Sequence, residues 1–207
     1  IEDDIELSSH HQKLLEGFFA QNQSWDILFT GLQIPLVPKQ ITFITDLYEK
    51  LHTQKHPQNA FFNMRDFLFV GAFSYIINKK SIGKFLKIYE QADANSPIDF
   101  IFREYICFRK ELKGYCAFPF GVKHAGVFDT TMGERKFELT YEYQYLFQKA
   151  FFYGTSLQQT YKDIAKYAKS IGYTIQDNTV TIKNIYQILY DMSRYITNSS
   201  SIEGKCG

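Results

Sequence analysis

Apolar residues at three- and four-residue spacing constrain the fold of this chain more than any other feature. The spacing is clearest in residues 39–54, where Ile41, Ile44, Tyr48 and Leu51 share one side of a helix. We therefore expect a mostly α fold, a compact bundle of about eight helices. The segments assigned to helices are 8–21, 24–31, 39–54, 60–80, 81–93, 95–114, 137–154, 155–172 and 184–197.

Two of these segments give the strongest support for a helical fold. Residues 60–80 are apolar on nearly every side, which predicts the central buried helix of the bundle. Residues 95–114 begin with Ser96 as N-cap, Pro97 at the first helical position and Asp99 in the first turn, and Gly114 follows the basic end. The sequence therefore predicts one long helix ahead of Gly114.

Two stretches depart from the helical spacing. In residues 173–182, β-branched residues alternate on both sides of Asp177-Asn178, which predicts one small β-hairpin near the C-terminus. Residues 114–136, which contain "GYCAFPFGVKHAGVFDTTMGE", are rich in glycine and phenylalanine and predict an irregular or β-like loop. If residues 115–120 and 122–128 form paired strands, Cys116 and His124 can face each other, and the hairpin strands can join this pair. The expected class is therefore mostly α with a small β element, α+β.

Composition bounds the class of protein. A chain of 207 residues with 45% hydrophobic and 22% charged residues predicts one globular domain, residues 1–198, and a polar tail at 199–207 that we expect to be disordered. The net charge of +1 gives no general support for nucleic-acid binding. Three cysteines without a CxxC pair argue against a disulfide framework. The longest apolar run, 67–77, is too short to span a membrane, and the acidic start is unlike a signal peptide.

The glycine-rich loop holds Cys116, His124 and Asp129 in that order, which raises the alternative of a thiol-dependent enzyme. A nucleophilic cysteine needs its thiolate stabilised, commonly at a helix N-terminus beside an imidazolium. No helix is expected to begin at Cys116, and a cysteine in an apolar run is usually a small buried side chain. We expect no catalytic residues and keep this set as the alternative.

Cofactor and metal sites are not indicated. The chain has neither a GxxxxGK[ST] nor a GxGxxG motif, so no phosphate-binding loop is expected. His52 and His56 are four residues apart, but no Glu of a zincin motif lies between them and Pro57 ends the helix. We expect no cofactor and no metal. The lysines of residues 79–87 raise a further alternative, a nucleic-acid-binding face, but acidic residues interrupt it.

Aromatic residues make up 17% of the chain, and some of them fall in the loop, where a connection does not need them. Loops rarely bury themselves completely, because their backbone polar groups would lose their hydrogen bonds. We therefore expect part of this loop to form an apolar patch for a protein partner. The proposed partner-binding residues are Tyr115, Phe118, Phe120, Val127 and Phe128.

The opening "IEDDIELSSHHQKLLEGFFAQNQSWDILF", the full length and the abundance of Ile, Lys, Asn, Tyr and Phe resemble LvgA-type adaptors of the Dot/Icm type IV secretion system of Legionella. The resemblance implies a cytosolic, non-enzymatic protein that joins the adaptors IcmS and IcmW on the C-terminal region of the coupling ATPase DotL. That assembly recruits effector proteins for export and virulence. The implied location is the bacterial cytoplasm, or the inner face of the membrane through a partner, without membrane insertion.

Overall fold

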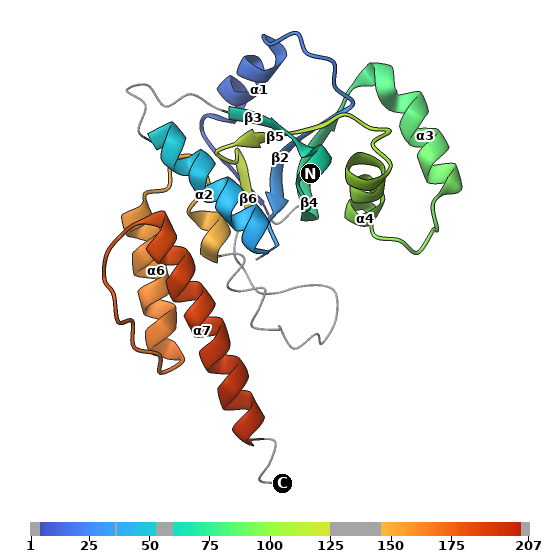
Figure 1. Ribbon diagram of the computed structural model, residues 1–207. Helices are drawn as coiled ribbons and strands as arrows, with labels where there is room; N and C mark the ends of the chain where they lie inside the picture. The colour runs from blue at the N-terminus through green and yellow to red at the C-terminus, as the bar shows by residue number, and fades with distance from the viewer. Residues whose placement is uncertain (1–4, 36, 53–59, 125–145, 204–207) are drawn as a thin grey trace. The chain divides into compact units, whose positions relative to one another are not determined.

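The structure, a computed structural model, describes residues 5–35, 37–52, 60–124 and 146–203, with only the backbone of His124 and of residues 196–203. The chain divides into two compact units, Ile1–Ala125 (unit 1) and Gly126–Gly207 (unit 2). Both β-sheets belong to unit 1 (Figure 1). The expectation of a single domain over 1–198 stays a prediction.

Unit 1 is built on a four-stranded sheet in the order β3-β5-β2-β4. The strands are β2, Ile27–Gln33; β3, Ala60–Asn63; β4, Val70–Ile77; and β5, Gly114–Phe118. β5 runs parallel to β2, and the two outer pairs, β3 with β5 and β4 with β2, are antiparallel. Strands are thus spread through the chain, and the predicted helical bundle with one C-terminal hairpin is wrong.

The error arose where strands are buried on both faces. Every residue of β2 is buried, and the segment expected to be the central helix, 60–80, instead forms β3, a short 3₁₀ turn and β4. A strand covered on both faces reads as a continuous apolar run, and periodicity cannot distinguish such a run from a buried helix. The helix expected at 24–31 is wrong for the same reason.

A second, two-stranded sheet pairs β1, Ile5–Leu7, with β6, Val122–His124, in antiparallel register. The two sheets approach closely at Gly31 of β2. A Cβ atom on Gly31 would lie 2.8 Å from the carbonyl oxygen of Val122, so only glycine leaves room for β6 at this point. The hydrogen bond from Gly121 N–H to the Thr30 carbonyl, at 2.9 Å, fixes the same crossing.

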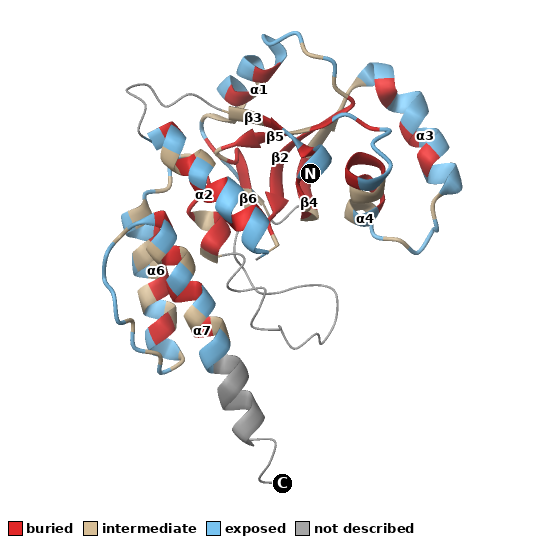
Figure 2. Ribbon diagram, in the orientation of Figure 1, coloured by how far each residue is buried: buried red, intermediate tan, exposed pale blue. Residues whose placement is uncertain are grey.

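Helices cover both faces of the larger sheet (Figures 1 and 2). On one face, Leu14 and Phe18 of α1, His11–Phe19, pack against Leu28 and Ala117. On the other face, Phe43 of α2, Pro38–His52, contacts Phe62 at 5.2 Å between ring centroids. On that face Phe102 of α4, Ile98–Arg103, lies 6.0 Å from Phe29. The helices expected within 8–21 and 39–54 are confirmed as α1 and α2, and residues 53–54 lie outside the described residues.

Two helices, α3 and α4, lie at the edge of unit 1. α3, Ile82–Gln91, is confirmed as expected, and its Phe85 ring lies 5.9 Å from Phe102 of α4. α4 continues into a π-helix, Glu104–Phe108. The helix predicted over 95–114 therefore ends earlier, and Gly114 starts β5 instead of capping it.

Unit 2, where the structure describes it, is helical. α6, Leu157–Ser170, and α7, Ile182–Glu203, lie side by side and run parallel (Figure 1). The connecting residues pass back along the pair, because Tyr173 stacks edge-on against Tyr195 while Tyr161 donates a hydrogen bond to Asn178 at 2.7 Å. The buried apolar side chains of this unit include Phe147, Phe151, Ile164, Ala168, Ile185, Leu189 and Met192.

The β-hairpin predicted around Asp177-Asn178 is wrong, since residues 173–181 contain no strand. The chain must return along the length of α6, about 20 Å at 1.5 Å per residue, before α7 can start parallel to it. An extended segment covers that distance, whereas a two-residue turn would reverse the chain. Asn184 binds the carbonyls of Asp177 and Thr179 and holds this path.

At the C-terminus, α7 extends through Glu203, so the segment expected to be a disordered tail, 199–207, begins within a helix, and residues 204–207 lie outside the described residues. Across the described chain, no helix has both the length and the apolar content needed to cross a lipid bilayer.

Candidate functional site

The loop that looked like a partner-binding patch is largely core. Phe118 at the end of β5 and Phe120 just after it have no exposed surface, and their rings meet edge-on at 5.7 Å. Tyr115 is half-buried against Phe18 of α1. Val127 and Phe128, the other two expected contact residues, lie outside the described residues. The described phenylalanines of this segment therefore support the sheet from inside and offer no surface to a partner.

The cysteine of the same loop is equally enclosed. Cys116 lies in β5 between Phe29 of β2 and Phe62 of β3, and it is fully buried. Burial raises the pKa of the Cys116 thiol well above its ordinary value, which removes the thiolate a nucleophile needs. The Sγ atom makes a weak contact to the Ala117 carbonyl oxygen, at 3.5 Å.

His124 does not pair with Cys116. The backbone of His124 is opposite Ile5 in the two-stranded sheet, whereas β5 belongs to the four-stranded sheet. The strand pairing that would have set Cys116 against His124 is therefore wrong for β5 and β6. Asp129, the third member of the set, lies outside the described residues.

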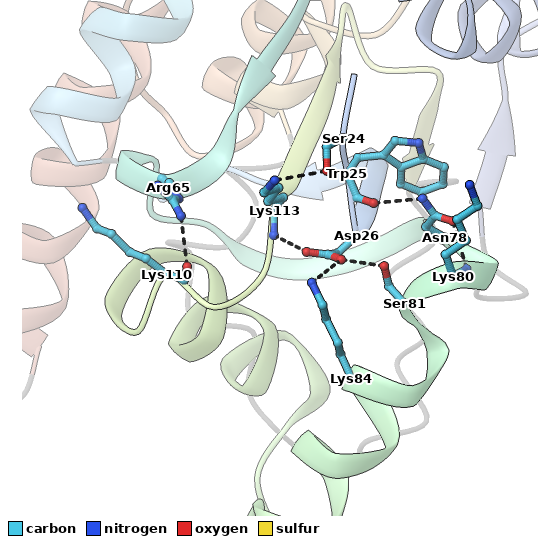
Figure 3. A network of polar contacts seen from close by, with 10 residues as sticks. All are labelled: Ser24, Trp25, Asp26, Arg65, Asn78, Lys80, Ser81, Lys84, Lys110 and Lys113. Carbon is cyan, nitrogen blue, oxygen red and sulfur yellow. Dashed lines mark hydrogen bonds and ion pairs between the residues drawn. The ribbon is translucent and has the colours of Figure 1, made fainter. Parts of the chain in front are cut away.

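Asp26, directly ahead of β2, is a buried carboxylate with several hydrogen-bond donors around it (Figure 3). Its Oδ1 atom accepts hydrogen bonds from the Ser81 hydroxyl and from Lys84 Nζ, the latter at 2.9 Å. Its Oδ2 atom accepts the Lys113 N–H at 2.8 Å. Burial alone would raise the pKa of Asp26, but the three donors together hold it below its ordinary value, so the group is a carboxylate at neutral pH.

The hydrogen bonds of Asp26 connect three elements of unit 1. They connect the start of β2 with the start of α3 through Ser81 and Lys84, and with the residue ahead of β5 through Lys113. The backbone repeats the connection, since Asn78 N–H donates to the Asp26 carbonyl at 2.9 Å. This network of hydrogen bonds therefore links α3 to the start of β2.

Metal ligands do not gather in the described parts of the chain: no group of three or more His, Cys, Asp or Glu side chains lies close enough there to hold an ion. Cys107 is a structural thiol, whose Sγ donates to the carbonyls of Met64 and Phe67 at 3.3 and 3.4 Å. Burial raises the pKa of Cys107 to about 11.

The strongest candidate for function is an exposed aromatic surface on α4 and the π-helix. Phe108 has 61% of its surface exposed, and Phe100, two turns earlier, has 47%. The guanidinium carbon of Arg103 lies 4.3 Å from the centroid of the Phe100 ring, and that of Arg109, the residue after Phe108, lies 4.6 Å from the centroid of the Tyr105 ring. We call these four side chains, Phe100, Arg103, Phe108 and Arg109, the Phe108 surface.

The π-helix explains why Phe108 faces solvent. Arg109 N–H donates a hydrogen bond to the Glu104 carbonyl oxygen at 2.9 Å. This is the i→i+5 bond of a π-helix, whose turn contains one residue more than the turn of an α-helix. Tyr105, Ile106 and Cys107 fill the buried side of that turn. The extra residue leaves Phe108 outside, turned back towards the side of Phe100. π-Turns of this kind often occur at functional sites.

The Phe108 surface was not predicted from the sequence, although the spacing of its aromatic residues indicated a common face. Phe100, Glu104 and Phe108 are spaced by four residues within the helix expected over 95–114, so they share one face. The glycine-rich composition of 114–136 favoured the loop phenylalanines instead, whose burial depends on strands distant in sequence.

Comparisons with protein-family models, with curated proteins and with solved structures found no match to this chain.

Proposed function

We propose that this chain is a protein-binding adaptor and that the Phe108 surface is its main contact with a partner. The observation that carries the proposal is the exposure of Phe108 and Phe100 beside two arginines. Single exposed apolar side chains are common on protein surfaces, whereas exposed apolar side chains that gather on one face mark sites of protein interaction.

The chemistry of the surface fits a protein partner. Phenylalanine and arginine are enriched at the centres of protein interfaces, and residues there can each contribute about 2 kcal/mol or more to binding. Arg103 is already stacked on Phe100, so it loses little conformational freedom when a partner covers it. Arginine side chains also favour a partner that presents carboxylates next to its apolar groups.

The resemblance to LvgA-type adaptors supplies the first partners to test. Under this proposal, the chain joins IcmS and IcmW on the C-terminal region of DotL in the bacterial cytoplasm and helps to recruit effector proteins. The support is the opening stretch of the sequence and the exposed aromatic surface, which suits assembly with other proteins. The protein then carries no chemistry of its own and acts by bringing others together.

Co-purification tests the proposal. The affinity-tagged chain is co-expressed with IcmS, IcmW and the C-terminal region of DotL, as wild type and with Phe100→Ser and Phe108→Ser combined. We expect wild type to retain the partners and the double variant to lose at least 90% of them. Tyr190→Ser is the control, because Tyr190 is a similarly exposed aromatic residue in unit 2.

Two outcomes contradict the proposal in different ways. If wild type retains neither these proteins nor any protein from bacterial cytosol, the adaptor function fails. If partners bind equally well to wild type and to the double variant, the adaptor function stands but the Phe108 surface is not the contact. Circular dichroism shows whether the double variant keeps its fold.

A further inference from the structure

α3 has a wider apolar face than the rest of unit 1 covers. Phe85 and Ile88 point into the core, while three other apolar residues of the same helix remain in solvent. At about 100° per residue these three fall within roughly 60° of the helix circumference, so they form a continuous stripe. The stripe consists of Ile82, Leu86 and Tyr89, which are 47%, 58% and 39% exposed.

The stripe is held rigidly. Ser81 and Lys84, at the first turn of α3, both donate hydrogen bonds to the buried carboxylate of Asp26 (Figure 3). Asn78, ahead of the helix, donates to the Trp25 carbonyl at 2.9 Å. A surface fixed in this way loses little entropy when it is covered, which favours binding.

Charges flank the stripe with opposite sign at its two ends. Lys79 and Lys80 precede α3, whereas Glu90 and Asp93 lie at and just beyond its other end, and all four are exposed. None of the four forms an ion pair with the part of the chain that the structure describes. The stripe is therefore apolar in its middle, with Lys79 and Lys80 at its start and Glu90 and Asp93 at its end, while the exposed Lys87 lies about 130° around the helix from it.

This pattern is complementary to itself when reversed. If two copies of α3 pack antiparallel and cross near Leu86, Leu86 meets Leu86 and Ile82 meets Tyr89 of the other copy. The same crossing sets Lys79 of one copy within about one helical turn of Glu90 and Asp93 of the other. A parallel pairing would set the lysines against lysines. Two-fold interfaces need this kind of self-complementarity.

We propose that the chain forms a two-fold symmetric homodimer through the exposed stripe of α3, with the helices antiparallel. Gly83 also lies in open space, since a Cβ atom at this position would meet nothing within 4 Å. The net charge of +1 produces little long-range repulsion between two copies. The charge pattern selects a second copy over an unrelated helix, which would have no reason to match both ends.

The expected dimer is weak. α3 is only about 15 Å long at 1.5 Å per residue, so the stripe alone buries less than a standard interface of about 1,600 Å². A dissociation constant in the range of about 10–100 μM is the order of magnitude for such a contact. The dimer is independent of the proposed adaptor function, since it uses neither Phe100 nor Phe108.

Sedimentation equilibrium of the purified full chain from about 1 to 500 μM measures the dimer. We expect wild type to pass from monomer to dimer across this range and Leu86→Asp to stay monomeric throughout. Tyr190→Asp, at a position in unit 2 that is 44% exposed, serves as the control and should dimerise like wild type. Thermal unfolding verifies that each variant is folded.

Charge reversal gives a test that does not depend on Leu86. One variant combines Lys79→Glu with Lys80→Glu, and a second combines Glu90→Lys with Asp93→Lys. Each alone places like charges at both ends of the interface, so we expect dimerisation at least tenfold weaker. Mixing the two variants restores opposite charges at both ends, so the mixture should dimerise like wild type at low salt and less well at high salt.

Three results overturn the proposal. Wild type that is monomeric up to 500 μM has no such dimer. A dimer that survives Leu86→Asp uses another surface, and a dimer unaffected by mixing the charge variants is not antiparallel. If wild type is monomeric while Leu86→Asp loses a partner protein in co-purification, the stripe binds that partner and not a second copy. Failure of the dimer leaves the test of the Phe108 surface unchanged.

Discussion

Two segments of unit 1 are both rich in aromatic residues and have opposite roles. Gly114–Phe118 with the residues that continue to Val122, and Ile98–Phe108, are both rich in phenylalanine and each contains one cysteine. The first lies inside the fold, with Phe118 and Phe120 fully buried, while the second exposes Phe100 and Phe108. Aromatic density therefore says little about exposure until the neighbouring strands are known.

The largest expected contrast is between two phenylalanines. Phe118→Ala removes a fully buried ring, so we expect a loss of about 3–5 kcal/mol in the free energy of unfolding. Phe108→Ala removes an exposed ring and should change that free energy by less than about 0.5 kcal/mol. Urea unfolding followed by the fluorescence of Trp25, the single tryptophan, reports on unit 1 for both variants. Equal losses in the two variants would show that the segments do not differ in burial.

The same contrast extends to acidic side chains. Asp26→Asn disrupts a buried carboxylate that accepts three donors, and we expect a loss of about 2–3 kcal/mol. Glu104→Gln, at an exposed ion pair with Arg109, should cost less than about 0.5 kcal/mol. Urea unfolding at pH 7 provides the comparison.

The pH dependence of Asp26 has a definite sign. Because its pKa in the folded protein is lower than the ordinary value of 3.8, its stabilisation is present above that pH and is lost as the pH falls below it. The difference between wild type and Asp26→Asn should therefore shrink between about pH 5 and about pH 3. A difference that stays constant over this range would mean that the carboxylate contributes no charge-dependent stability.

The smallest expected effect tests the contact between the two segments. A Cβ atom on Gly114 would lie 2.9 Å from Cδ1 of Ile106 in the π-helix, so Gly114→Ala should cost about 1–2 kcal/mol through overpacking. Ile106→Val removes that methyl group but keeps Cγ2 and Cγ1, which would lie 3.1 and 3.3 Å away, so in its background the cost of Gly114→Ala should fall without vanishing. Gly83→Ala, in open space, is the control and should not destabilise. Additive losses in the double variant would show that the two residues do not touch.

The helices that sequence alone located share one property: one face is buried and the other is solvated. α2 buries Ile41, Ile44 and Leu51 on one side, and that arrangement is what periodicity detects. β2 is buried on every residue and β4 on its central residues, so neither shows an alternating pattern. These segments form strands because they pair with segments distant in sequence, and the local spacing of apolar residues carries no information about such pairing.

The candidate site was hidden for a related reason. The exposure of Phe108 depends on a five-residue hydrogen bond between Arg109 and Glu104, which ends the regular helix earlier than the caps indicate. The position of Phe100 on the same helix face as Phe108 could be predicted from the four-residue spacing through Glu104. The burial of Phe118 and Cys116 could not be predicted from local spacing, because it results from the pairing of β5 with β2 and β3.

The central pairing of the larger sheet also governs when this unit can fold. β2 has β5 as its parallel neighbour, and Ile27 is opposite Gly114, 87 residues later in the chain. During synthesis at about 5–20 residues per second, the apolar strands β2, β3 and β4 therefore wait for seconds without the strand that joins β2 to β3. A nascent chain in this state exposes strand edges prone to aggregation, so protection by a general chaperone during translation should raise the yield of folded protein.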